Sequence, residues 1–500
     1  MTRALVARRC FMAALLPLAL LLAFVGCHGD FFVGVDQADA STAGGAPGTG
    51  GSQHASDDAG HAIFVPASSD ASPELCTDPN AQCPGVISCP GTQETTLTGT
   101  VFDPAGKTPL FNAIVYVPQS TPPAMAPGTS TCSQCAVAVG DYIAATTTDV
   151  NGVFTLKESP MGKNIPLVIQ MGKWRRQIVV PSVPACETTQ VPAELTRLPR
   201  NRTEGDIPQM AVLTGACDGI GCFLRHVGLD AQEFTGPDGD GRLHVYRGAG
   251  RGPDLAGGGG GTAGDCTGDA GACPLWTTKQ DLERYDTVLL GCECGENDQT
   301  KPDKFPMHDW LNEGGSVIAV HDQETWFKNG PSDFQSVATW GPEDASAPGP
   351  FVVDNSFPRG QLFLNWLSGA GGIASDGTVL LHAADVSASI ASAGSQSNRW
   401  IFDKGDADAS PASVAYLSFL TPIGGVPGAN PSEATAYCGK AVVTDVHVGA
   451  SAAPSNAPIP ESCGTGDLSP EEKALEFLLF DQSVCQTMLP KGLPPGPNEE

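Results

Sequence analysis

Apolar runs and amphipathic stretches alternate in the second half of the chain, most clearly between residues 285 and 327. Residues 287–290 (TVLL) and 317–320 (VIAV) are unbroken apolar runs, which are typical of buried strands. Between them, residues 305–311 place apolar side chains at helical spacing, and Gly314-Gly315 follows as a stop signal. A strand, a helix and a strand within about 35 residues predict a βαβ unit with parallel strands.

The same alternation extends over the C-terminal half and predicts an α/β domain. Buried strands are expected at Met210–Leu213 and Leu243–Tyr246, and a later core strand in GKAVVTDVHV, residues 439–448. The strongest helix is expected in residues 470–485, where Ser469 is a suitable N-cap.

Residues 95–183 follow a different pattern, with apolar side chains at every second position. Strands are expected at Ala113–Val117 and Val153–Leu156, and the DPAG segment and Asn151-Gly152 are suited to turns. Several short strands of this kind predict a small antiparallel β-sandwich. The predicted fold class is therefore multidomain: a small antiparallel β-sandwich plus an α/β domain, preceded by a disordered N-terminal tether.

The first 27 residues have the features of an export signal. Three arginines precede an apolar run, residues 11–25, and the tetrapeptide FVGC ends it at Cys27. The run is shorter than the roughly 20 residues that a membrane-spanning helix needs. Residues 1–27 resemble a bacterial lipoprotein signal peptide. The resemblance implies lipidation at Cys27 and a place in the bacterial cell envelope, on the outer membrane or the periplasmic face of the inner membrane.

Composition adds a tether and excludes one class of partner. Residues 28–92 are rich in Gly, Ala, Ser, Asp and Pro, which predicts a flexible segment. The net charge of −28 argues against nucleic acid, because phosphate binding needs clustered Lys and Arg. The expected partners are the membrane, through the lipid anchor, and a carbohydrate or an envelope protein.

The chain has 17 cysteines, and 15 remain once Cys10 in the signal and the lipid-bearing Cys27 are set aside. In an exported protein such a number predicts disulfides, and an odd remainder leaves at least one thiol free or intermolecular. The close pairs expected to be bonded are Cys132/Cys135, Cys217/Cys222, Cys266/Cys273 and Cys438/Cys463.

The sequence predicts no metal and no cofactor. The Gly-rich insertion at residues 248–274 lacks the GK[ST] that a phosphate-binding loop requires. Asp238 and Asp240 resemble half of a calcium loop, but the Glu at its twelfth position is missing. The thiolates of CSQC and CEC are not followed by a second CxxC or an HxxxH at zinc-ligand spacing.

Two longer resemblances go with the two domains. The segments GTVFDPAGKTPLFNAIVYV and TTTDVNGVFTL, within residues 93–195, resemble the carboxypeptidase regulatory-like, transthyretin-like domain, which implies a non-catalytic β-sandwich. Residues 206–488 resemble the ThuA-like branch of the class I glutamine amidotransferase-like, flavodoxin-like fold, in the segments IPQMAVLTG, YDTVLLGC, WLNEGGSVIAVHDQ and GKAVVTDVHV. The positions that match the ThuA-like pattern are Gly314, Gly315, His321, Gly439, Thr444 and His447. The Cys-His-Glu triad of the amidotransferases is not present.

His321 and His447 are the candidate catalytic residues, because each follows a predicted core strand. An imidazole at the carboxyl edge of a sheet can act as acid or base near neutral pH, and Asp322 or Glu324 would orient His321. The alternative is a structural role for each histidine, with its ring bonded to a loop carbonyl.

Cys292 and Cys294 also follow a predicted strand, where a thiolate could attack a carbonyl group. In an oxidising compartment we expect a disulfide instead, with Cys217 or Cys222 as the partner.

Two functions remain. The first is a lipid-anchored envelope protein that binds a carbohydrate or protein ligand, or serves as a scaffold, without catalysis. The alternative is a ThuA-like hydrolase or isomerase that acts on carbohydrate through His321 and His447. The distance between the two imidazoles discriminates, because beyond about 10 Å they cannot act on one substrate.

Overall fold

The computed structural model describes residues 85–128, 141–249, 254–255, 261–268, 273–342, 346–405, 413–427, 436–448, 458–464 and 466–483. The chain divides into two units, residues 1–60 and 61–500, and every described residue lies in the second. The predicted signal peptide with Cys27, and most of the predicted tether, lie outside the described residues. Within the described ranges, no helix is both long and apolar enough to cross a bilayer.

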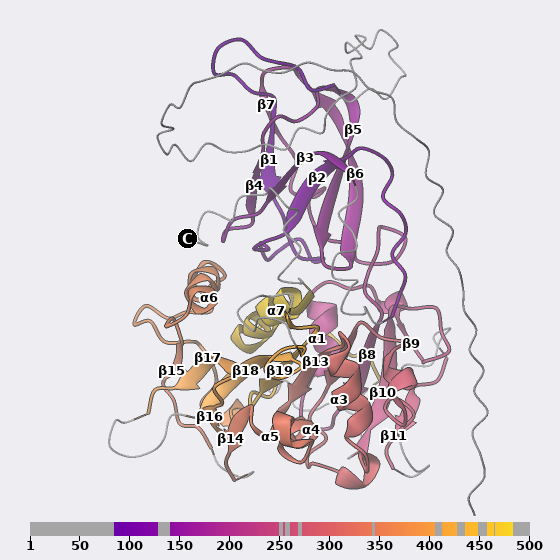
Figure 1. The fold of residues 1–500 in the computed structure, drawn as a ribbon, viewed down its shortest axis with the longest axis vertical. Helices are drawn as coiled ribbons and strands as arrows, with labels where there is room; N and C mark the ends of the chain where they lie inside the picture. Colours follow the sequence, from indigo (N-terminus) through magenta and orange to yellow (C-terminus); the bar gives the residue numbers. More distant parts are fainter. Residues whose placement is uncertain are drawn as a thin grey trace, which may run out of the picture. The chain divides into compact units, whose positions relative to one another are not determined.

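The described part is multidomain, with a β-rich region followed by an α/β region (Figure 1). In the β-rich region the two sheets have the strand orders β4-β1-β7 and β3-β2-β5-β6. Their strands are β1 (Thr96–Thr100), β2 (Ile114–Pro118), β3 (Tyr142–Thr147), β4 (Val153–Leu156), β5 (Gly162–Met171), β6 (Trp174–Val183) and β7 (Thr188–Gln190). Pairing is antiparallel except between β1 and β7. The strands predicted near residues 113–117 and at 153–156 are confirmed as β2 and β4.

The α/β region is centred on one large sheet, with the order β11-β10-β8-β12-β13-β19-β18-β17-β15 and β9 paired to β10. The strands from β11 to β19 run parallel, and β18, β17 and β15 continue antiparallel. Their bounds are β8 (Met210–Thr214), β9 (Phe234–Thr235), β10 (Leu243–Gly248), β11 (Gly264–Cys266), β12 (Thr287–Leu290), β13 (Ser316–Val320), β15 (Phe351–Val353), β17 (Ser397–Asp403), β18 (Val414–Thr421) and β19 (Gly439–Thr444). Strands β14 (Ala338–Trp340) and β16 (Ile390–Ala393) form a separate pair.

The predicted βαβ unit is confirmed. Strands β12 and β13 lie side by side and parallel, with Leu289 opposite Ile318. The connecting helix α3 (Phe305–Asn312) buries Met307 and Trp310, while Phe305 is exposed. Gly314, with a φ of 121°, ends the helical segment in a backbone conformation that favours glycine.

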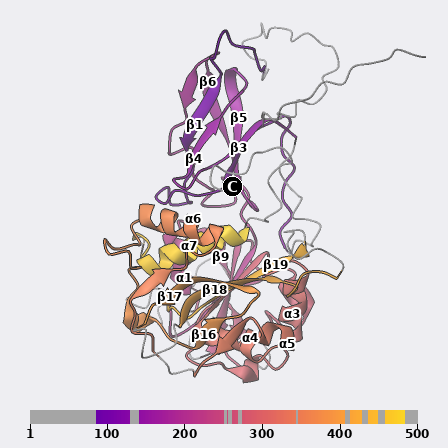
Figure 2. The same ribbon diagram turned by 60° about the vertical axis from the view of Figure 1, so that its left-hand side comes forward.

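Helices cover both faces of the large sheet (Figures 1 and 2). Besides α3, the helices are α1 (Ile220–His226), α2 (Lys279–Leu282), α4 (Thr325–Lys328), α5 (Ser332–Gln335), α6 (Pro358–Gly369) and α7 (Pro470–Ser483), with 3-10 turns η2 (Ala231–Glu233), η4 (Asp298–Thr300), η5 (His321–Glu324) and η6 (Ala383–Asp385). Leu289 and Ile318 point into the core shared with α1, α6 and α7, whereas Val288 and Val317 point into the core shared with α3, α4 and α5. This alternation follows from the period of two along a strand.

Helix α7 begins where the sequence predicts. The Ser469 hydroxyl accepts the backbone N–H of Glu472 at 3.2 Å, and the Glu472 carboxylate accepts the backbone N–H of Ser469 at 2.9 Å. These two bonds form a capping box, which satisfies donors at the start of the helix.

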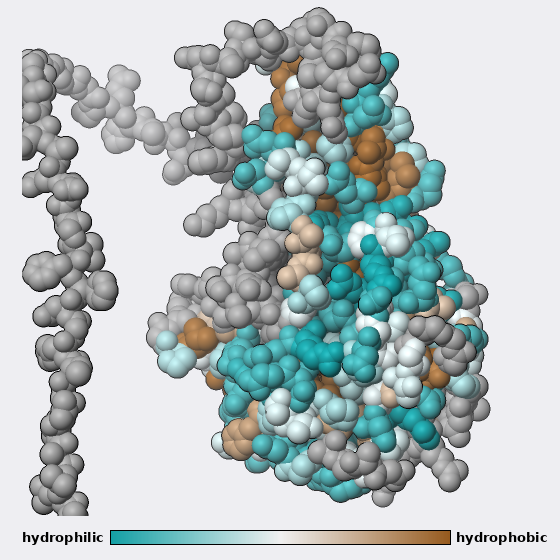
Figure 3. All heavy atoms as spheres, turned by 90° about the vertical axis from the view of Figure 1, so that its right-hand side faces the viewer, coloured by the Kyte–Doolittle hydropathy of each residue, from teal (hydrophilic) through white to brown (hydrophobic). Residues whose placement is uncertain are grey.

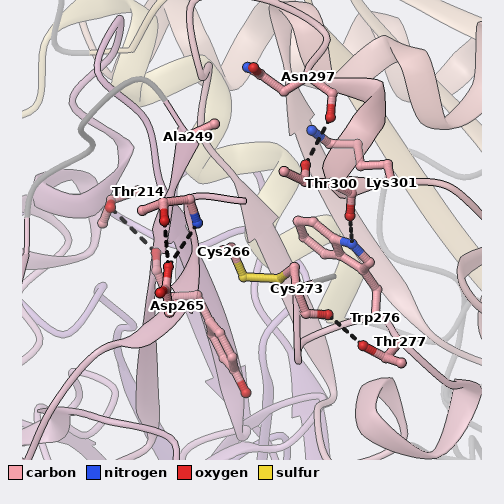
Figure 4. Close-up of a disulfide and its surroundings, with 12 residues drawn as sticks. Thr214, Ala249, Asp265, Cys266, Cys273, Trp276, Thr277, Asn297, Thr300 and Lys301 are labelled. Carbon is pink, nitrogen blue, oxygen red and sulfur yellow. Dashed lines mark hydrogen bonds between the residues drawn. A yellow bond between two sulfur atoms is a disulfide. The ribbon is translucent and has the colours of Figure 1, made fainter. Parts of the chain in front are cut away.

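Disulfides connect segments that lie far apart in the sequence. Of the predicted pairs, Cys266–Cys273 is confirmed, and Figure 4 shows it beside the Trp276 indole, which donates to the Thr300 carbonyl at 2.8 Å. Two predicted pairs are wrong, because Cys217 bonds Cys294 and Cys222 bonds Cys463, while the fourth described disulfide is Cys89–Cys186. The pair Cys132/Cys135 lies outside the described residues.

The incorrect pairings have a local cause. Cys217 lies in the loop before α1, where its backbone N–H donates to the Cys292 carbonyl, and Cys222 lies within α1. Loop and helix direct the two sulfurs to different neighbours, although only four residues separate them in the sequence.

The face seen in Figure 3 is mainly hydrophilic, with hydrophobic side chains in small, separate groups. Such a surface agrees with the high negative charge of the sequence, which keeps protein molecules apart in solution.

Candidate functional site

Three strands deliver the candidate residues to the same edge of the sheet. Cys292 follows β12, His321 directly follows β13, and His447 comes three residues after β19. Because these three strands are neighbours and run parallel, their carboxyl ends meet at one edge, where open α/β sheets bind ligands.

The strand order also places a topological switch at this edge. Strands β10 and β12 lie on opposite sides of β8, so the chain crosses over β8 between them. Crevices form beyond the carboxyl ends of strands at such a crossover, and Cys292 is the second residue after β12.

The imidazoles of His321 and His447 are in direct contact. His447 Nε2 lies 3.0 Å from His321 Nδ1, and the ring centroids are 4.7 Å apart at an interplanar angle of 83°. The Cys292 thiol lies 3.5 Å from the same Nδ1 atom. The sequence-predicted histidines are therefore brought together, with a cysteine beside them.

Asp322 completes the group. One carboxylate oxygen lies 3.4 Å from His321 Nδ1, and the other accepts the Cys292 thiol at 3.2 Å. His321 Nδ1 consequently faces a thiol, an imidazole and a carboxylate, although one ring nitrogen supplies only a single N–H or a single lone pair. The other ring nitrogen, Nε2, is buried and has no hydrogen-bond partner among the described residues.

The backbone at this edge is unusual in two places. His321 has a φ of 48°, a left-handed conformation that residues other than glycine seldom adopt and that often accompanies functional sites. The loop after β8 approaches that after β12 so closely that a Cβ at Gly215 would lie 1.9 Å from the Cys292 carbonyl oxygen. Glycine at this position lets the two loops meet.

Electrostatics keep both His447 and Cys292 neutral. Burial lowers the pKa of His447 to about 4, and the neighbouring His321 adds to the effect. Burial also raises the pKa of the Cys292 thiol far above its usual value, and the charges of Asp218 and Asp322 add to this. Without a cation nearby, Cys292 is a thiol and not a nucleophilic thiolate.

Asp218 is a buried residue that bonds the backbone of the site. Its carboxylate accepts the backbone N–H groups of Cys292 and Ile220, and it is almost fully buried. Burial raises its pKa to about 7, against the lowering effect of those two hydrogen bonds. This carboxylate positions the backbone at Cys292.

The Glu324 carboxylate bonds residues other than His321. Its carboxylate accepts the Ser389 hydroxyl at 2.7 Å and pairs with Lys328 at 3.4 Å. Ser389 also contacts the buried Asp445 carboxylate. Burial and the charge of Asp445 raise the pKa of Glu324 to about 8. Of the two carboxylates expected to orient His321, Asp322 is therefore the one that touches the ring.

A buried ion pair holds the loop after β12. Lys301 Nζ lies 2.5 Å from Glu293, and both side chains are completely buried. The Glu293 carboxylate also accepts the Gln323 amide at 2.9 Å and the Ala249 backbone N–H at 2.6 Å. Glu293 thus connects this loop to the residues that follow β13 and β10.

Sequence reasoning missed two members of this edge, Asp218 and Asp445, and it expected Cys292 to form a disulfide. Cys292 is the free cysteine of the described residues, whereas the predicted disulfide forms at Cys294. Asp218 and Asp445 were not singled out, although each follows a core strand closely. The rule that selected His321, a polar side chain just beyond an apolar run, would have found both.

Comparisons with known proteins do not identify the chain. No family model and no curated protein matches it. Two solved structures, both mutant type II cohesin–X-dockerin complexes from Acetivibrio cellulolyticus, share 15% identity with it at a TM-score of 0.15. The C-terminal interface mutant covers 30% of this chain and 79% of its own, and the N-terminal interface mutant 29% and 78%. At that TM-score the similarity supports no conclusion about fold, partner or function.

Proposed function

We propose that this protein is a lipid-anchored cell-envelope enzyme, a ThuA-like hydrolase or isomerase that acts on carbohydrate through His321 and His447. The observation that carries the proposal is the 3.0 Å contact between His321 Nδ1 and His447 Nε2. Two imidazoles from separate strands, in contact at the ligand-binding edge of a parallel sheet, are suited to serve one substrate.

The contact reverses the order of the two hypotheses. The sequence favoured a binding or scaffold module for a carbohydrate or envelope protein, and a separation beyond about 10 Å would have supported it. The left-handed backbone at His321 and the unpartnered Nε2 atom add weight to a catalytic site.

The chemistry assigns a role to each side chain. His447, with its pKa lowered to about 4, is a neutral imidazole whose Nε2 holds His321 Nδ1. Asp322 supplies negative charge on the same side of the ring. His321 Nε2 is left to bond the substrate, as acid or base near neutral pH.

The domain assignments belong to the same proposal. The parallel strand order, with β8 between β10 and β12 and followed by β13 and β19, supports a flavodoxin-like, ThuA-like domain over residues 206–488. The paired sheets of β1–β7 support a carboxypeptidase regulatory-like sandwich over residues 93–195, which acts as a spacer between the anchor and the enzyme.

The test is a turnover screen on a panel of oligosaccharides and simple sugars, using the full-length protein in detergent. We expect activity in the wild type and a loss of about 100-fold to 10,000-fold in His321→Asn, because a positioned acid or base contributes that much and asparagine tolerates the left-handed backbone at this position. His308→Gln is the matched control, since His308 bonds Asp309 and Asp333 on another part of the domain. Ligand binding without turnover in the wild type would restore the binding-module hypothesis.

The anchor has a separate test. Cys27→Ser removes the proposed lipid acceptor, so the protein should move from the membrane fraction to the soluble fraction. Unchanged membrane association of the Cys27→Ser protein would refute the lipoprotein assignment.

A further inference from the structure

We propose that Cys292, His321 and His447 bind a zinc ion. This inference rests on the proposed function for its location, since the ion would lie between His321 Nδ1 and His447 Nε2, replace the direct contact of these two atoms and leave His321 Nε2 for the substrate. Each residue offers one ligand atom, and the three atoms, Sγ, Nδ1 and Nε2, all lie within 4.8 Å of one another. The ligands come from three different strand ends, so no spacing motif marks them in the sequence.

The distances fit tetrahedral coordination. Zinc binds imidazole nitrogen at about 2.0–2.1 Å and thiolate sulfur at about 2.3 Å, which places two nitrogens about 3.3 Å apart and a sulfur and a nitrogen about 3.5 Å apart. Cys292 Sγ lies 3.5 Å from His321 Nδ1, and the two histidine nitrogens are 3.0 Å apart. Two of the three ligand–ligand distances are therefore within about 0.3 Å of those of a tetrahedral site, and the third lies below 4.8 Å.

A bound metal would explain why three polar groups surround His321 Nδ1. His321 Nδ1 faces the Cys292 thiol, the His447 imidazole and the Asp322 carboxylate, and it can form one good hydrogen bond at most. A cation between these atoms uses the lone pairs of all of them at once.

The charge balance points the same way. Asp218, Asp322 and Asp445 are buried near the site, and no lysine or arginine of the described residues forms an ion pair with any of them. The neighbouring lysines, Lys301 and Lys328, are paired with glutamates. A divalent cation would attract these carboxyl groups in their ionised form, and Asp322 and Asp218 already touch the ligand residues as outer-shell carboxylates of metal sites do.

The ligand set distinguishes zinc from copper. A cysteine with two histidines also suits electron-transfer copper sites, which add a weak axial thioether or similar ligand. Here the side chain that touches both Cys292 and His321 is the carboxylate of Asp322, a hard oxygen ligand of the kind zinc accepts. Three protein ligands leave a fourth position for water or a substrate oxygen, as in catalytic zinc sites.

The experiment reads the metal directly and does not depend on turnover. Full-length protein in detergent is stripped with a chelator and titrated with Zn²⁺, and in parallel with Co²⁺, whose bond to a thiolate absorbs strongly in the near ultraviolet. We expect one ion per chain, the Co²⁺–thiolate band in the wild type, and no such band in Cys292→Ser. His447→Gln should keep the band but bind more than about 100-fold more weakly, since even outer-shell substitutions cost about 10-fold to 100-fold.

Controls and opposing outcomes separate this proposal from the catalytic one. His308→Gln should bind like the wild type, and circular dichroism identifies any variant that fails to fold. The zinc site is refuted if the wild type shows no thiolate band, if Cys292→Ser binds unchanged, or if Cu²⁺ binds in preference with an intense visible band. Bound zinc without turnover would keep the metal site and refute the enzyme, whereas turnover in a wild-type protein that binds no zinc would do the reverse.

Discussion

The β-rich region, taken together with the residues up to 205 that follow its last strand, differs from the edge of the large sheet in how its acidic side chains are paired. In the segment after β7, Glu204 accepts two hydrogen bonds of 2.6 Å from the Arg197 guanidinium, which lowers the pKa of Glu204 to about 2. At the sheet edge, burial and the charge of Asp445 raise the pKa of Glu324 to about 8, and burial raises that of Asp218 to about 7.

The contrast shows where stability and function diverge. A carboxylate that meets an arginine stabilises the folded chain at neutral pH. Buried carboxyl groups with a raised pKa reduce stability at neutral pH, and such groups occur more often at functional sites than elsewhere. The raised pKa values of Asp218 and Glu324, in contrast to the lowered pKa of Glu204, distinguish this edge.

The largest expected effect on stability is at the buried ion pair between Lys301 and Glu293, in the loop that follows β12. Lys301→Met leaves Glu293 buried without its cation, so the free energy of unfolding should fall by about 3–5 kcal/mol, measured by urea denaturation. The double substitution Lys301→Met with Glu293→Gln should recover part of this loss, because no uncompensated charge remains. A loss below about 1 kcal/mol in the single variant would show that the pair is solvated.

The pH dependence of stability should follow the raised pKa of Glu324. A carboxyl group whose folded pKa is about 8 holds its proton in the folded state and has lost it in the unfolded state above about pH 5. Stability is therefore greatest below the unfolded pKa and declines as pH rises toward about 8, by at most about 1.4 kcal/mol per pH unit for one proton. The groups that face this carboxyl are Asp445, Ser389 and Lys328.

Glu324→Gln should flatten that decline, since the amide does not titrate. Unfolding by urea between about pH 5 and about pH 8 measures it. Glu204 affects stability in the opposite sense, because its pKa is lowered to about 2 in the folded protein. The stability that Glu204 contributes is present above its unfolded pKa and is lost as the pH falls through about 2. Equal slopes in wild type and Glu324→Gln would contradict the assignment of the raised pKa to this group.

The smallest effect is expected at an exposed pair of the β-rich region. Lys157 lies 3.5 Å from Glu94, with side chains that are 68% and 45% exposed. Lys157→Met should change the free energy of unfolding by about 0.5 kcal/mol or less, because solvent screens such pairs. A change above about 1 kcal/mol, in the same urea experiment, would remove the distinction between the two regions.

Much of the fold was predictable because it depends on local pattern. The run at residues 287–290 is β12 to the residue, and the run at 317–320 lies within β13. Their parallel pairing follows from the helix between them, and the contact between His321 and His447 follows from parallel strand ends. The N-cap at Ser469 was equally local.

The rest depends on tertiary geometry. Cys292 and Cys294 are two residues apart, yet one forms a disulfide with Cys217 and the other stays free, because the loop directs them to different neighbours. Periodicity does not encode that choice. Likewise, the pairing of Glu324 with Ser389, and not with His321, depends on the left-handed turn that begins the η5 segment.

The left-handed backbone at His321 sets a limit on redesign. Cys292 and His447 are not among the described residues with a positive φ, so the main chain at these two positions accepts many side chains. At position 321 the choice narrows to residues such as asparagine, aspartate or glycine, because β-branched replacements would strain the main chain. Substitutions at position 321 should therefore be chosen from these residues, so that a loss of activity reports the missing imidazole and not a strained main chain.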